Sequence, residues 1–186
     1  MPLDTHPIVL YYNKYILAKA GLLDDKGLPT GLDGADNFKA ALGKAKAAGA
    51  KFGIAGVTAD GNFMYRTIYS LMCQQGGELY TNGKFLDGDN PAKLAKALAT
   101  IADWTKSGLQ SGYTDYPSTV ALFTSGQAAF MINGVWEVPT MTDLKKNGKL
   151  FEWGAIELPK LFDKKCTYAD SHTFAIPANK GKTMTP

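Results

Sequence analysis

The chain contains only two cysteines and two histidines among 186 residues, and this scarcity restricts the metal and redox chemistry open to it. Cys73 and Cys166 lie far apart in the sequence and lack the spacing of metal ligands. Cys73 falls within an apolar helical pattern, where a buried and inert thiol is the usual state. With His6 and His172 as the only imidazoles, a zinc site would be hard to assemble. We therefore expect no metal, no cofactor and no disulfide scaffold.

Charge of one sign and long apolar runs are scarce as well. The formal net charge is +3 and the lysines are scattered, which gives little support to nucleic-acid binding. The apolar runs stay well below the roughly 20 residues that span a bilayer. The chain opens without the charged and apolar regions of a signal peptide, so we expect that such a leader is absent or has been removed.

The hydrophobic pattern alternates between short strand-like runs and longer helical stripes. Strands are predicted at residues 8–12, 52–57, 128–132, 152–158 and 173–176. Helices are predicted at residues 15–23, 36–48, 62–75, 90–107, 118–124 and 137–147, with Asp36 and Asn90 as N-caps of two of them. The Asn82-Gly83 pair within residues 78–86 predicts a hairpin. Strands that alternate with helices indicate an α/β fold with a covered sheet.

The stretch from Gly126 to Trp136 is the most informative part of the sequence. Its apolar run is bounded by glycine on one side and by Asn133-Gly134 on the other, which predicts a buried strand that ends in a turn. Trp136 follows that turn and precedes a predicted helix, the position where open α/β sheets form ligand sites. The alternative is that Trp136 packs in the core, as we expect of Trp104 and Trp153.

Both ends of the chain are unusual for a complete domain. A polar segment at residues 2–7 runs directly into the first strand, and the sequence stops at Thr185-Pro186, a cap and first-turn pair that normally begins a helix. We interpret the chain as a piece of a longer polypeptide. The alternative is a tail that frays.

Eight short motifs follow one another along nearly the whole chain. They are Tyr11-Tyr12-Asn13-Lys14, Ala20-Gly21-Leu22, Gly76-Gly77-Glu78-Leu79-Tyr80, Asp103-Trp104 with Gly108-Leu109, Phe123 with Gly126-Gln127-Ala128-Ala129-Phe130, Asn133-Gly134-Val135-Trp136, Trp153-Gly154 with Leu158-Pro159, and Phe174-Ala175-Ile176-Pro177. In this order the motifs resemble the extracellular solute-binding proteins of family 1, the maltose-binding-protein-like receptors of ABC importers. One departure is Gly34-Ala35-Asp36-Asn37-Phe38, where the family usually has Thr-Trp-Asp-Glu-Phe, so one tryptophan contact is lost.

The resemblance implies a specific fold and a specific place in a larger protein. Receptors of this family have two lobes, and the matching motifs belong to the second, C-terminal lobe. The implied fold for residues 1–186 is a single periplasmic-binding-protein-like (type II) domain, with a central, mostly parallel sheet covered by helices on both faces. The first lobe of the same polypeptide and the membrane subunits of an ABC permease are implied as partners. The parent protein is implied to be periplasmic or lipid-anchored on the extracellular face of the membrane.

The resemblance also implies a carbohydrate ligand that is bound in the cleft between lobes and is not chemically changed. Sugar rings present apolar C–H faces and hydroxyl edges, so their sites combine flat aromatic side chains with fixed polar groups. Trp136 resembles the stacking tryptophan of this lobe, and free N–H groups of the following helix start could donate to hydroxyls. Because the first lobe is missing, we expect Trp136 to be a solvent-exposed half-site.

Polar residues from three other segments complete the predicted site. Asp4 and His6 lie on one face of an extended segment that resembles the family's hinge, and the alternative is that they bond each other. Tyr65 and Arg66 lie near a helix start where the family places an aromatic, whereas Phe63 is expected in the core. Ser171 and His172 fall where the chain re-enters the implied cleft.

An enzyme has less support than a receptor. Asp170, Ser171 and His172 are consecutive and point to alternate faces of a strand, so they cannot form a catalytic triad. A glycosidase needs two carboxylates across a cleft, and nothing pairs Asp4 with another. The alternatives left open are a carbohydrate-active or other small α/β hydrolytic enzyme domain, and a receptor lobe for a solute other than sugar.

Overall fold

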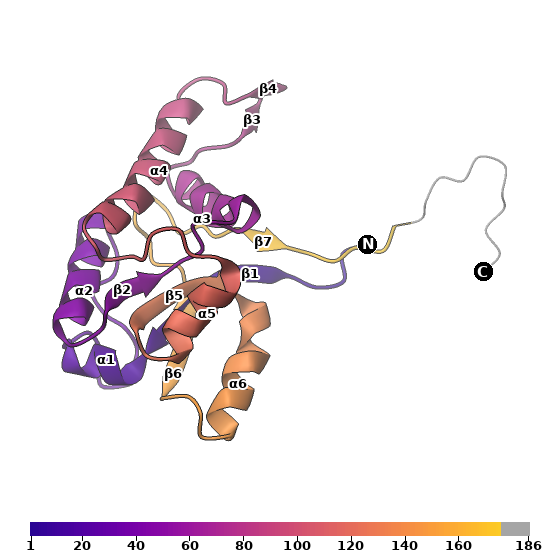
Figure 1. The fold of residues 1–186 in the computed structure, drawn as a ribbon. Helices are drawn as coiled ribbons and strands as arrows, with labels where there is room; N and C mark the ends of the chain where they lie inside the picture. The colour runs from indigo at the N-terminus through magenta and orange to yellow at the C-terminus, as the bar shows by residue number, and fades with distance from the viewer. Residues whose placement is uncertain (176–186) are drawn as a thin grey trace, which may run out of the picture.

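Strand β1 (His6–Asn13) lies at the centre of a five-stranded sheet in the computed structural model, which describes residues 1–175. The strand order is β2-β5-β1-β6, and β7 pairs with the start of β1 (Figure 1). The other strands are β2 (Phe52–Ala55), β5 (Ala128–Gly134), β6 (Trp153–Glu157) and β7 (Ala169–Asp170). The buried run before Trp136 therefore forms the predicted strand, and every residue of β5 is buried.

The sheet is mixed, because β1 runs against its neighbours. β1 is antiparallel to β5, β6 and β7, while β2 and β5 are parallel. β2, β5, β6 and β7 therefore all point in one direction, as the prediction of a mostly parallel sheet requires, and β1 points in the opposite direction. Since β1 lies between β5 and β6, β2–β5 is the one parallel ladder of the sheet in the described part of the chain.

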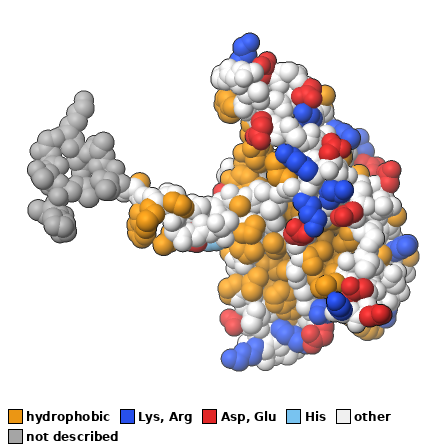
Figure 2. Space-filling model, turned by 180° about the vertical axis from the view of Figure 1, so that it is seen from behind, with side chains coloured by type: hydrophobic (Ala, Val, Ile, Leu, Met, Phe, Trp, Pro, Cys, Tyr) orange, Lys and Arg blue, Asp and Glu red, His pale blue; other side chains and the backbone are white. Residues whose placement is uncertain are grey.

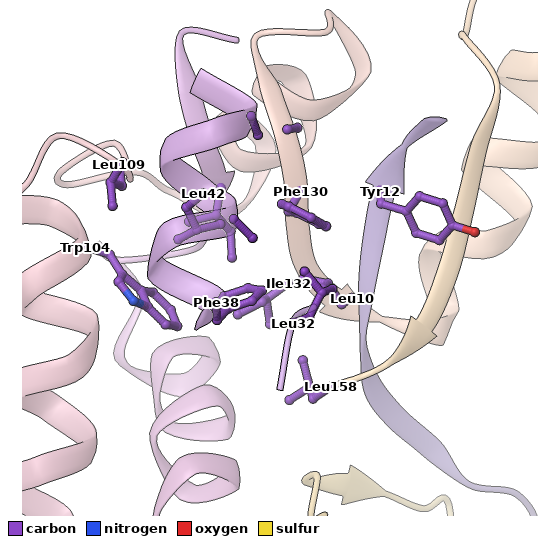
Figure 3. Close-up of a cluster of buried hydrophobic side chains, with 14 of the residues drawn as sticks. Leu10, Tyr12, Leu32, Phe38, Leu42, Trp104, Leu109, Phe130, Ile132 and Leu158 are labelled. Carbon is purple, nitrogen blue, oxygen red and sulfur yellow. The ribbon is translucent and has the colours of Figure 1, made fainter. Parts of the chain in front are cut away.

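Two apolar clusters, one on each face of the sheet, confirm an α/β fold covered on both sides. The helices are α1 (Lys14–Lys19), α2 (Ala35–Ala47), α3 (Gly61–Gln74), α4 (Asn90–Lys106), α5 (Tyr116–Thr124) and α6 (Val138–Lys146). Alternation along β1 sends Leu10 into the larger cluster with α2, α3 and α4, and Tyr11 into the smaller cluster with α5 and α6. In the larger cluster Phe38 lies between Trp104 and Phe130, with ring centroids 5.4 and 5.9 Å away (Figure 3).

Most predicted large core residues are buried. Trp104 and Phe63 are 2% and 4% exposed, which confirms their core assignment. Trp153 is only half-buried, and it packs against the edge of the smaller cluster. Among the described residues, none of the helices combines the length and apolarity that crossing a membrane requires.

Two predicted N-caps are wrong. Helix α2 begins at Ala35 with Gly34 as its N-cap, and Asp36 lies in the first turn, where a negative charge favours the helix N-terminus. Helix α4 has Asp89 as its N-cap. The buried Asn90 side chain instead accepts a hydrogen bond from the Glu78 N–H at 2.9 Å. It thereby fastens the neighbouring hairpin to α4.

The predicted hairpin is confirmed and comprises β3 (Tyr80–Thr81) and β4 (Lys84–Phe85). Asn82 and Gly83 have φ of 53° and 75°, the left-handed conformation that a type I′ turn requires at both central positions.

The first and last described segments run side by side and leave the body of the molecule together (Figures 1 and 2). Leu3 N–H donates to the carbonyl oxygen of His172 at 2.8 Å, and Phe174 N–H donates to that of Met1 at 3.0 Å. The strand predicted at 173–176 is not formed over its described part, where Thr173 makes a single bridge to Pro2. The regular pairing with β1 occurs earlier, at β7. Ile176 lies outside the described residues.

Cys73 and Cys166 form a disulfide, with their Cα atoms 5.9 Å apart. The expectation of an inert thiol at Cys73 is therefore wrong. Spacing could not reveal the bond, because the two residues are separated by 93 positions. Disulfides persist in oxidising compartments, which agrees with an extracellular protein.

Candidate functional site

Five of the seven predicted site residues surround one hollow of about 510 Å³ at the base of the projecting segments. Its lining is His6, Arg66, Trp136, Asp170, Ser171 and His172. Asp4 contacts two of these side chains, while Tyr65 lies outside the lining. In Figure 2 a histidine side chain is visible in pale blue where the projecting segments meet the body. The fold therefore gathers residues from both ends of the chain, from α3 and from the end of β5.

Trp136 lies on a short 3-10 helix, η1 (Val135–Glu137), that follows β5 directly. Its ring lies against Gly134, where an added Cβ atom would be only 2.1 Å from the ring carbon Cζ3. The Trp136 ring meets Phe63 and His6 edge-on, at centroid distances of 6.3 and 6.4 Å. These contacts leave Trp136 half-buried, so the expectation of a solvent-exposed side chain is not met.

Tyr116 fixes the polar edge of the tryptophan. Trp136 Nε1 donates to the Tyr116 hydroxyl at 2.7 Å, and that hydroxyl bonds to the Glu137 carboxylate. Burial, followed by the hydrogen bond to Glu137, raises the pKa of Tyr116 to about 12. The hydroxyl therefore stays protonated and can keep donating. Because the indole N–H is already satisfied, Trp136 offers a ligand its ring rather than a hydrogen bond.

Asp170 holds Arg66 in place beside the hollow. Arg66 Nε and Nη2 both lie 2.9 Å from Asp170 Oδ2, and Tyr168 donates to Oδ1 at 2.6 Å. The hydrogen bond from Tyr168, assisted by Arg66, lowers the pKa of Asp170 below its ordinary value. A guanidinium has five N–H donors, so Arg66 keeps some of them for a ligand. Asp170 was not predicted as a site residue, although it is adjacent to Ser171 in the sequence.

Asp4 bridges the two histidines of the chain. Asp4 Oδ2 lies 3.2 Å from His6 Nε2 and 2.8 Å from His172 Nδ1, while Asp4 Oδ1 accepts from the His172 backbone N–H at 2.9 Å. The hydrogen bonds from His172 are the largest cause that lowers the pKa of Asp4. Asp4 and His6 do contact each other, as the alternative to ligand binding supposed. The third member was not foreseen, because His172 is 168 positions from Asp4.

Tyr65 takes part in an aromatic group next to the hollow. Its ring stacks on Tyr69 at 5.8 Å and meets Tyr168 edge-on at 5.5 Å. Tyr65 is 40% exposed, so one side of this group remains accessible.

Ser171 is exposed and shows no arrangement typical of a nucleophile. Its hydroxyl donates to the carbonyl oxygen of His172 at 3.0 Å rather than to an imidazole nitrogen. A nucleophilic serine needs a base within hydrogen-bond reach. The geometry of Ser171 therefore suits binding better than hydrolysis.

A hollow of about 580 Å³ lies elsewhere, between the loop after α1 and strand β6. Leu28, Leu32, Ile156 and Leu158 contribute to its apolar lining, and no tyrosine, tryptophan or phenylalanine is present there. It contains no predicted site residue. Because it lacks a flat ring, it is less suited to a sugar than the hollow beside Trp136.

Comparison with known proteins gives a consistent result. The family described as "Bacterial extracellular solute-binding protein" matches residues 1–185. The galactooligosaccharide-binding protein of Bacillus subtilis (strain 168) is 30% identical, with 87% of this chain and 36% of that protein covered.

Two solved structures show a similar fold. The cyclic alpha-maltosyl-1,6-maltose binding protein of Arthrobacter globiformis has a TM-score of 0.67 at 23% identity, covering 89% of this chain and 40% of that one. The GacH receptor of Streptomyces glaucescens, studied unliganded and with acarbose, has a TM-score of 0.66 at 20% identity. The match covers 92% of this chain and 41% of that one.

These comparisons confirm the family resemblance, and they show that it covers only part of each relative. The chain spans about two fifths of the length of the relatives that it matches. The family is described by extracellular solute binding, which agrees with a binding protein and not with the enzyme alternative. The chain belongs to the bacterial extracellular solute-binding proteins.

Proposed function

We propose that this chain is the second lobe of a sugar receptor of an ABC importer, and that the hollow beside Trp136 is its half of the sugar site. The observation that carries the proposal is the tryptophan ring held by Tyr116 and Gly134 next to Arg66. A fixed flat ring suits the C–H face of a sugar, and neighbouring polar groups suit its hydroxyls. The relatives named for binding galactooligosaccharide and cyclic maltosyl-maltose support a carbohydrate ligand.

We assign the hydroxyl-binding roles to the polar side chains around the ring. Arg66 is oriented by Asp170, and His6 and His172 present their imidazoles to the same hollow. Ser171 adds an exposed hydroxyl. Tyr65 lies farther out, in the aromatic group with Tyr69, where it could extend stacking to a second ring of an oligosaccharide.

In this proposal the remaining half of the site lies on the first lobe of the same polypeptide. The paired segments around Leu3 and His172 would be the crossings between lobes, because they leave the body together. Closure of the lobes on a sugar would then be the state that the permease subunits recognise, a ligand-driven population shift. The parent protein would act in a periplasm or from a lipid anchor outside the cell.

The half-site picture predicts weak sugar binding by this chain alone. A receptor with a dissociation constant of about 1 μM binds with about −8 kcal/mol, and half of that corresponds to about 1 mM. In a thermal-shift screen with mono- and oligosaccharides, we expect the chain of 186 residues to respond only at millimolar sugar. The protein with both lobes should respond at micromolar concentrations of the same sugar.

Two results would contradict the proposal. Micromolar sugar binding by this chain alone would mean that its site is complete and not a half. A response of the two-lobed protein to a solute other than sugar, with none to any sugar, would assign the receptor to another ligand class.

A further inference from the structure

We propose that Asp4, His6 and His172 form a binding site for a divalent transition-metal ion such as Zn²⁺. Each residue offers one ligand atom, and these atoms lie within 4.8 Å of one another. Two imidazole nitrogens and one carboxylate oxygen are a ligand set that zinc uses in proteins. This site goes beyond sugar binding and does not depend on it.

The spacing of the ligand atoms is close to that of a zinc site. In a tetrahedral site with bonds of about 2.0–2.2 Å, neighbouring ligand atoms lie about 3.4 Å apart. Asp4 Oδ2 is 3.2 Å from His6 Nε2 and 2.8 Å from His172 Nδ1. To admit an ion in place of the present hydrogen bonds, the carboxylate would move slightly away from both imidazoles, whose ligand nitrogens lie within 4.8 Å of each other.

The surroundings allow an ion to enter and do not repel it. The His172 side chain is 71% exposed, and the Asp4 and His6 side chains are partly exposed at 34% and 26%. Arg66 lies on the wall of the same hollow, and its positive charge is balanced by Asp170 at 2.9 Å. Three protein ligands would leave the fourth position of a tetrahedral ion open.

A bound ion would have a defined structural effect. Asp4 and His6 belong to the first segment of the chain, and His172 belongs to the segment that runs beside it. Coordination would cross-link the two segments at the base of their projection. Because a ligand that binds only the folded state stabilises it, zinc should raise the melting temperature.

Zinc titration of the whole chain by isothermal calorimetry tests the proposal. We expect a single Zn²⁺ per chain, and a loss of affinity of about tenfold or more in each of His6→Ala, His172→Gln and Asp4→Asn. Asp25→Asn, an exposed carboxylate in the loop after α1, is the matched control and should bind as the native chain does. Ca²⁺, which prefers oxygen ligands, should not compete for the site.

The chain has no other histidine, so the interpretation of the titration is direct. Unchanged zinc affinity in the double variant His6→Ala with His172→Gln would overturn the proposal. So would the absence of zinc binding by the native chain at a zinc concentration of about 1 mM. Circular dichroism of each variant verifies that it is folded, and these outcomes are independent of any sugar.

Discussion

Replacing Cys73 and Cys166 together with alanine is expected to lower the free energy of unfolding by about 2–5 kcal/mol. The disulfide closes a loop of 93 residues, and long loops lose the most entropy in the unfolded chain when they are cross-linked. It joins α3 to the segment that leads to β7 and the candidate site. Urea unfolding of the native chain and the double variant, followed by circular dichroism, measures the difference.

Loss of the disulfide should also affect the candidate site beside Trp136. The same segment is docked on α3 by Gln74, which donates to the carbonyl oxygens of Pro159 and Cys166 and accepts from Leu161 N–H. These bonds remain without the disulfide, so the variant should fold but release the segment more often. Reduction of the native chain should reproduce the loss seen in the variant. The disulfide would be shown to be absent by two results together. The denatured native chain would contain two reactive thiols without added reductant, and its free energy of unfolding would equal that of the double variant.

Gly134→Ala is expected to destabilise the chain by about 1–3 kcal/mol and to displace the ring of Trp136. The new methyl group would occupy space that the ring already fills, since the nearest ring carbons lie 2.1 and 2.2 Å from its position. The backbone of Gly134 has an ordinary φ of −82°, so the cost comes from crowding and not from backbone strain. A shifted tryptophan emission spectrum together with a lower urea midpoint would report both effects.

Gly43→Ala is the matched control for this substitution. Gly43 lies inside helix α2, and an added Cβ there meets no atom within 4 Å. Alanine in a helix interior is favoured over glycine by roughly 0.5–1 kcal/mol, so this variant should be equally or more stable. If Gly134→Ala kept the stability and the emission spectrum of the native chain, the ring would not depend on the space at Gly134.

The local elements of this fold could largely be predicted from the sequence, because their signals are local. The buried run of β5 and the Asn82-Gly83 turn depend on neighbouring residues, and both are confirmed. Caps were predicted less well. Asparagine is a residue type that often caps helices, but the buried Asn90 side chain instead accepts a hydrogen bond from the Glu78 N–H.

The site could be predicted only in part, because its contacts connect distant positions. The resemblance supplied the candidate residues, and the fold brings Trp136, Arg66 and His172 around one hollow. Tyr116 lies 20 positions before Trp136, and neither residue type nor spacing could indicate that its hydroxyl accepts the hydrogen bond from the indole N–H. The same limit applies to the disulfide. Pairing over such separations is set by the tertiary fold, which local patterns do not encode.

The most direct test of the account is calorimetric titration of the proposed two-lobed protein with a sugar to which it responds in the thermal-shift screen, comparing Trp136→Ala with the native sequence. If Trp136 stacks on the sugar, the alanine variant should lose at least about 2 kcal/mol of binding free energy, roughly 30-fold in affinity. Trp136→Phe keeps a flat ring and should recover most of that loss. Unchanged affinity in Trp136→Ala, with the variant folded, would contradict the stacking site.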